Sequence, residues 1–122
     1  MKRDLDLIRG ILLAIEKSPW SQIYASSLVI DDVASEAIIY NAFLAWDAGF
    51  VEAGTVSAPS GNNLLIRRMT FDGHDFLDMV RADEQWSTIR QMAQDSSIEL
   101  TVEAVKRIAA KLNEAALSEI AV

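Results

Sequence analysis

The sequence contains no cysteine and only one histidine, His74. The missing cysteines exclude disulfide bonds, thiolate catalysis and zinc sites built on cysteine. The single histidine excludes a metal site with two histidine ligands. We therefore expect no cofactor and no resident metal.

Basic residues are scarce, and the middle of the chain has none. The whole sequence carries 11 Lys and Arg against 18 Asp and Glu, a net charge of −7. No Lys or Arg stands between Lys17 and Arg67, where the five acids are Asp31, Asp32, Glu36, Asp47 and Glu52. Cations that neutralise phosphates supply most of the non-specific affinity for nucleic acid. The middle segment therefore argues against DNA binding, and the overall charge argues against an anionic membrane surface.

Long apolar runs are missing as well. The longest, Ala37–Trp46, contains Asn41 and is followed by Asp47, which leaves it well short of the ~20 apolar residues of a membrane span. The N-terminus begins with Lys and Arg as a signal peptide does, but charged residues interrupt any apolar core, namely Asp4, Asp6 and Arg9. We expect a cytoplasmic protein that does not enter a membrane.

What the sequence does contain predicts a mainly helical α+β fold. With 122 residues, 51% hydrophobic and 24% charged, the chain can bury a core of its own. Leu5, Ile8, Leu12 and Ile15 recur at helical spacing and predict a helix over 4–17. Ser18-Pro19 should end it, because the residue before proline is driven out of the helical region.

The next segments predict a short strand over 26–30 and a second helix over 34–48. Asp31, Asp32 or Ser35 could cap that helix, and Gly49 suits the left-handed residue that follows a helix. Its expected buried face consists of Ile38, Ile39, Ala42, Phe43 and Trp46.

Two β-prone runs, 50–53 and 64–69, flank a stretch rich in Gly, Ser, Pro and Asn, which predicts a β-hairpin with a long tip over 54–63. Three more helices are expected, over 71–82 after a Thr70 cap, over 83–94, and from Thr101 to about Ser118. Val105, Ile108 and Leu112 form an apolar stripe on the last one.

This order of elements resembles a winged-helix domain with one helix missing or degenerate. The segments 47–52 and 69–77 resemble the entry to and the exit from the wing in bacterial winged-helix regulators. Gly49 permits a positive φ at the helix end, and Gly73 allows a close approach in the first turn of the next helix. The expected organisation is a winged-helix-like domain over 1–95, with a helix over 96–122 that packs on it or on a second copy.

The segments 1–9 and 70–78, followed by Arg81, Asp83 and Trp86, resemble the bacterial and phage family numbered 2513 among the domains of unknown function. The resemblance implies a small soluble protein, often from bacterial genomes or prophages, with no established activity. It implies no catalytic residues.

Four kinds of site follow from the residues. DNA binding would place the second helix in the major groove and would need Lys2, Arg3, Arg9, Arg67 and Arg68 on one face. His74, between Asp72 and Asp75, would need a nucleophile or pocket to act as a general base; otherwise it is a structural contact against Trp86 or the wing. An acidic cluster could hold a hard cation weakly or form a solvated face: Asp72, Asp75, Asp78, Asp83 and Glu84.

The fourth kind of site is a protein interface. Trp20 is the tryptophan expected at the surface, whereas Trp46 is expected in the core. The stripe of the last helix either packs back on the first helix or forms a homodimer. The candidate interaction residues are Trp20, Arg67, Arg68, His74, Val105, Ile108 and Leu112. The leading interpretation is a protein-interaction or regulatory module, the alternative is a DNA-binding transcriptional regulator, and an enzyme ranks last.

Overall fold

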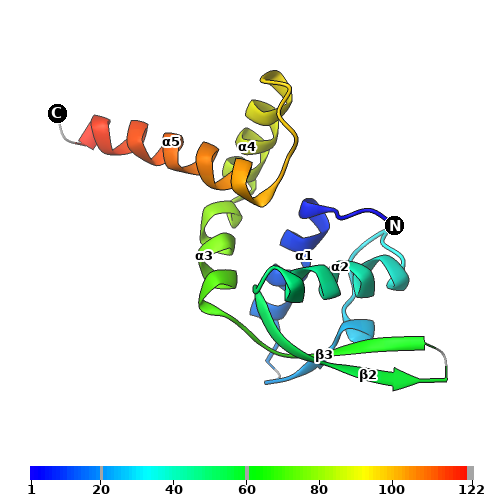
Figure 1. Ribbon diagram of the computed structural model, residues 1–122. Helices are drawn as coiled ribbons and strands as arrows, with labels where there is room; N and C mark the ends of the chain where they lie inside the picture. Colours follow the sequence, from blue (N-terminus) through cyan, green and yellow to red (C-terminus); the bar gives the residue numbers. More distant parts are fainter. Residues whose placement is uncertain (20, 60, 121–122) are drawn as a thin grey trace. The chain divides into compact units, whose positions relative to one another are not determined.

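The computed structural model describes residues 1–19, 21–59 and 61–120, in two compact units, Met1–Leu77 and Asp78–Val122. The elements are α1 (Leu5–Lys17), β1 (Ile23–Tyr24), the 3-10 helix η1 (Ala25–Ser27), α2 (Ser35–Asp47), β2 (Val51–Ala58), β3 (Gly61–Met69), α3 (Phe71–Val80), α4 (Asp83–Asp95) and α5 (Val102–Ile120). The strands form one antiparallel sheet in the order β1-β3-β2 (Figure 1). The expected mainly helical α+β class is confirmed.

Helix α1 begins and ends where the sequence predicts. The carboxylate of Asp4 accepts a hydrogen bond from the backbone N–H of Leu7 at 3.1 Å, which caps the N-terminus. Ser18 has extended backbone angles before Pro19 and ends the helix. The buried face consists of Leu5, Leu7, Ile8, Ile11 and Leu12, and α1 contacts both α2 and β3.

The strand predicted over 26–30 is wrong. Instead, Ile23 and Tyr24 pair with Ile66 and Leu65 of β3, and η1 follows at once. The apolar run that suggested a strand leaves the sheet, and its Val29 is 86% exposed. A two-residue strand is too short for an alternating pattern to reveal it.

The predicted inward face of α2 is only partly right, since Ile38 and Ala42 are buried as expected and the other three residues are not. The buried residues of α2 are Ile38, Asn41, Ala42 and Ala45, and the helix contacts α1, η1, β2 and β3. Ile39, Phe43 and Trp46 are only half-buried, because the alanines let the helix lie close to its neighbours on the other side. The predicted caps are also wrong, since Ala34 occupies the N-cap position without a side-chain hydrogen bond.

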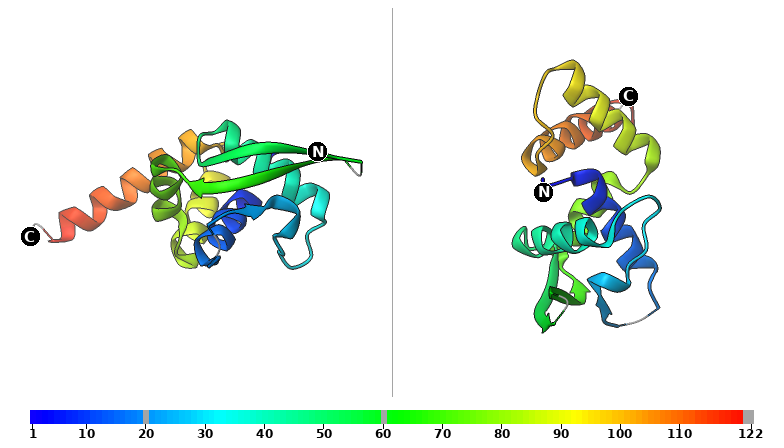
Figure 2. Two further views of the ribbon diagram at one scale, coloured as in Figure 1. Left: turned by 90° about the horizontal axis from the view of Figure 1, so that it is seen from below. Right: turned by 90° about the vertical axis from the view of Figure 1, so that its right-hand side faces the viewer.

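Strands β2 and β3 pair from Val51–Met69 out to Ala58–Gly61, so the prediction of a long tip over 54–63 is wrong. Figure 2 shows this hairpin running along one side of the first unit. Leu64, Ile66 and Met69 are buried, as are Val51 and Ala53, so one face of the hairpin belongs to the core. The pairing is irregular between Glu52 and Ala53.

The end of α2, the base of the hairpin and the start of α3 meet in one hydrogen-bonded junction. The Thr70 hydroxyl donates to the carbonyl oxygen of Gly49, and it accepts from the backbone N–H of Gly73 at 3.0 Å. The backbone N–H of Thr70 donates to the carbonyl oxygen of Phe50 at 2.9 Å. Gly49 has φ +79, as predicted, and the Thr70 cap is confirmed.

In the second unit, α4 and α5 pack against each other. The buried residues of the two helices are Trp86, Ile89, Ala93, Ala104, Val105, Ile108 and Ala109. Thr101 caps α5, since its hydroxyl accepts from the backbone N–H of Ala104 at 3.1 Å. Every residue from Asn113 to Glu119 is exposed, and no other element of this unit lies beside that distal half of α5 (Figures 1 and 2).

Gly73→Ala should destabilise the protein by about 1–3 kcal/mol or more, the range for overpacking a tight site. A Cβ at Gly73 would lie 2.1 Å from the carbonyl oxygen of Phe50 and 2.7 Å from Cγ of Met69. The control is Gly10→Ala inside α1, where a Cβ would approach Ile30 no closer than 3.7 Å. That change should stabilise by up to ~1 kcal/mol through helix propensity. Urea unfolding, followed by circular dichroism, measures the free energy of unfolding of both variants. Equal effects would contradict the close contact of Gly73 with Phe50 and Met69.

Asn41→Ala should lower the free energy of unfolding by about 1–3 kcal/mol, because it removes a buried amide together with its two hydrogen bonds to the backbone. The Asn41 side chain is buried and accepts from the backbone N–H of Asp4 at 2.9 Å. It also donates to the carbonyl oxygen of Ala37 at 3.0 Å. Asn62→Ala, at an exposed position of the hairpin, should change stability by less than about 0.5 kcal/mol. The same urea titration checks the pair.

Candidate functional site

Helix α2 presents an aromatic and acidic outer surface. Tyr40 is 37% exposed, and Ile39, Phe43 and Trp46 are half-buried beside it. The Phe43 and Trp46 rings contact each other, with centroids 6.3 Å apart and planes tilted by 50°. Two exposed carboxylates complete the surface, Glu36 in the first turn and Asp47 in the last. We call these six residues the α2 surface.

The α2 surface differs from that of an ordinary amphipathic helix. A surface helix normally has a polar outer face, and apolar residues all round are typical of a helix covered on every side. Aromatic side chains with a polar end, such as Tyr40, are enriched at the centres of protein interfaces. With no cation between Lys17 and Arg67, the chemistry of this surface suits an apolar and basic partner.

A second feature is a hollow of about 260 Å³ at the edge of the sheet, which we call the His74 hollow. Its lining comes from the end of α1, the segment before β1, the last residues of β3, and α3: Ile15, Glu16, Ser18, Ser21, Gln22, Ile23, Ile66, Arg67, Arg68, Met69 and His74. The fold therefore brings together three predicted site residues that lie on two elements, Arg67, Arg68 and His74.

Both arginine side chains in the lining of the His74 hollow already have partners within the protein. The guanidinium of Arg68 forms an ion pair with the Glu52 carboxylate at 2.7 Å. The Arg67 side chain lies over Gly54 and donates to the carbonyl oxygen of Ala53 at 3.4 Å. Glu16 adds a negative charge to the lining.

His74 is exposed, and its imidazole has no hydrogen-bond partner among the residues that the structure describes. A catalytic histidine is normally held by hydrogen bonds to a nucleophile and to an orienting group. The described residues therefore leave the ring accessible and provide no hydrogen bond that would orient it as a general base.

The cations near the N-terminus do not lie with Arg67 and Arg68 in the His74 hollow. Lys2 and Arg3 precede α1, whereas Arg67 and Arg68 line a hollow formed with its last turn. A helix of 13 residues is about 20 Å long, so the two pairs are separated by the length of α1. Arg9 lies between them and is half-buried.

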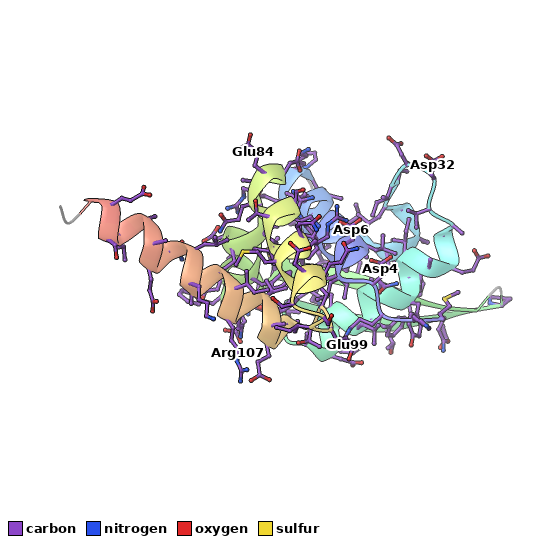
Figure 3. The ribbon with its side chains drawn as sticks, turned by 90° about the horizontal axis from the view of Figure 1, so that it is seen from above. Asp4, Asp6, Asp32, Glu84, Glu99 and Arg107 are labelled. Atoms are coloured by element: carbon purple, nitrogen blue, oxygen red, sulfur yellow. The ribbon has the colours of Figure 1, made fainter. Side chains whose placement is uncertain are left out.

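The third feature is a groove of about 490 Å³ beside the first half of α5, the α5 groove. It is lined by Ile98, Thr101, Glu103, Ala104, Arg107, Ile108, Ala110 and Lys111. Figure 3 labels Arg107 on α5 and Glu99 on the segment before the helix. Of the predicted stripe, Val105 and Ile108 are buried in the fold, whereas Leu112 is half-buried where the exposed distal half begins.

Three other expectations concern acids, membranes and Trp20. Among residues 1–19, 21–59 and 61–120, no group of three or more acidic or histidine side chains is placed to hold a metal ion. Within the same residues, no helix combines the length and apolarity needed to cross a bilayer. Trp20 lies outside the described residues.

The sequence could not have revealed the α2 surface or the α5 groove. Ile39, Phe43 and Trp46 look like core residues until their neighbours on α2 are seen to be buried instead. The α5 groove depends on Ile98, which lies in a segment without regular structure and is 52% exposed. Only the absence of Lys and Arg around α2 could be predicted from the sequence.

Comparison with known proteins gives a family without an assigned activity. An uncharacterised protein of Haemophilus influenzae is 34% identical over 112 residues, which cover 89% of this chain and 92% of that protein. No solved structure matches. A family described as "Hypothetical protein (DUF2513)" matches residues 2–99, and the chain belongs to this family.

Proposed function

We propose that this protein is a protein-interaction module, and that the α2 surface is where its partner docks. The order α1, β1, η1, α2, β2 and β3 supports a winged-helix-like unit, with η1 in the place of the degenerate helix. In DNA-binding domains of the helix-turn-helix kind, the recognition helix makes the main contact, with the major groove of DNA. In this chain that helix is α2, and its surface is aromatic and acidic rather than basic.

The observation that carries the proposal is the exposure of apolar side chains on α2. Tyr40 and its half-buried neighbours Phe43 and Trp46 remain in contact with water although α2 already buries its other face. Covering them would remove apolar area from water at about 25 cal/mol per Å². Glu36 and Asp47 at the two ends favour a partner segment that carries Lys or Arg beside its apolar residues.

The alternative, a DNA-binding regulator, has weaker support. It would rely on Arg67 and Arg68, of which Arg68 is already paired with Glu52. Lys2 and Arg3 stand at the far end of α1. A cytoplasmic location fits the cysteine-free sequence, and a regulatory role would follow from the partner that the module binds.

The chemistry of the partner can be tested by selecting random displayed peptides on the immobilised full-length chain. Peptides that combine aromatic or aliphatic residues with Lys or Arg should be enriched, because they match the α2 surface. Glu36→Lys combined with Asp47→Lys should weaken the best peptide at least about tenfold, whereas Asp31→Lys combined with Glu99→Lys, an equal change of charge at two exposed positions outside α2, should not. Fluorescence polarisation measures each affinity.

Two outcomes of the selection would overturn the proposal. One is enrichment that is equally strong on a Tyr40→Ser chain. The other is enrichment of acidic peptides without apolar residues.

The full-length chain should not bind a labelled DNA duplex at about 50 mM salt, where electrostatic binding is strong. The reason is that the surface of α2 offers carboxylates where a phosphate contact needs cations. Fluorescence polarisation checks this, with a basic winged-helix protein as the positive control. A micromolar affinity that Arg67→Ala or Arg68→Ala weakens would favour the alternative.

A further inference from the structure

The distal half of α5 is a helix without a neighbour in its own unit. Residues 113–119 are all exposed, and Leu117 is 64% exposed. Isolated helices of this length are marginal in water. A partner along this half would therefore stabilise it and cover its apolar side chains.

The α5 groove and this distal half lie along the same face of one helix. Arg107, Lys111, Glu114 and Ser118 follow one another at spacings of four, three and four residues, so they share one face of the helix, a polar seam along which a second helix can lie. The first two line the groove and the last two belong to the distal half. Arg107 is already paired with Glu103 of the groove lining at 2.8 Å, so the charges of this face that a partner can meet are the cation Lys111 in its first part and the carboxylate of Glu114 in its second.

That charge order is complementary to itself when the helix is reversed. In an antiparallel pair centred between Leu112 and Asn113, Lys111 lies opposite Glu114 of the second copy, and Arg107 lies opposite Ser118. Leu117 then lies near Ala110 of the groove lining, on the flank of the seam. Lys111 and Glu114 are exposed, and neither has an ion-pair partner among the described residues.

We infer that two copies of this chain associate through α5, with the distal half of each helix seated in the α5 groove of the other. The inference rests on the proposed role in protein interaction and names a second copy as one partner. The contact is the same on both copies, so it closes at a dimer instead of growing into a filament. It involves no residue of the α2 surface.

Sedimentation velocity of the full-length chain, from about 1 μM to about 1 mM, should show a monomer–dimer equilibrium whose dissociation constant lies within that range of concentrations. Lys111→Glu and Glu114→Lys should each raise the dimer dissociation constant at least about tenfold, since each turns two attractive pairs into two repulsive ones. Lys106→Glu makes the same change of charge on α5 outside the groove lining and should leave the dimer unchanged.

A mixture of the two variants separates an intermolecular pair from one within a helix. In the mixed dimer both cross-pairs are again opposite in sign, so Lys111→Glu mixed with Glu114→Lys should associate although each alone does not. A chain that stays monomeric throughout would overturn the inference, and so would a dimer unaffected by both reversals, or a mixture that fails to associate. None of these results would change the peptide selection on the α2 surface, so the two proposals fail separately.

Discussion

The first unit depends on the hydrogen bonds of one side chain, those of the Thr70 hydroxyl group. This hydroxyl joins three segments because it donates to Gly49, at the end of α2, and accepts from Gly73, in the first turn of α3. The rings of Phe50 and Phe76 stack beside it, with centroids 4.7 Å apart. A side chain at Gly73 would collide with the Phe50 carbonyl oxygen, so the close approach and the hydrogen bonds require each other.

This junction also decides which residues of α2 face water. With the end of the helix held against the hairpin, Ala42 and Ala45 lie against the core, and the larger Phe43 and Trp46 are left at the surface. Asn41 fixes the other side of α2 by its hydrogen bond to the backbone of Asp4. The outward aromatic residues are therefore a result of close packing between small side chains on the opposite face of α2.

Local signals in the sequence were sufficient for the ends of α1 and for the starts of α3 and α5, whereas the caps predicted for α2 were wrong. Thr70 and Thr101 are caps, Pro19 follows an end, Gly49 has the positive φ that glycine favours, and Gly73 occupies a position that a Cβ cannot enter. These effects act within a few residues and can be read directly. The hairpin tip was missed because its Gly, Ser and Asn residues favour loops, whereas pairing along the whole of β2 and β3 holds them in strands. Tertiary context overrides propensity there.

The candidate sites were less predictable because they depend on contacts between distant segments. His74 and Arg68 meet only because β3 runs back past the end of α1. The inward face of α2 was misjudged in part because hydrophobicity does not tell which of two apolar faces packs more closely. Charge was the exception, since the lack of cations between Lys17 and Arg67 holds in any fold.

The backbone amide protons in the two halves of α5 should exchange with solvent at very different rates. Around Val105 and Ala109 the backbone is covered, so hydrogen exchange requires that α5 separates from α4. From Asn113 to Glu119 every residue contacts water, and fraying of the end is enough to release the protons. Deuterium uptake along this single helix thus reports how much of it is covered, without a reporter group attached to the protein.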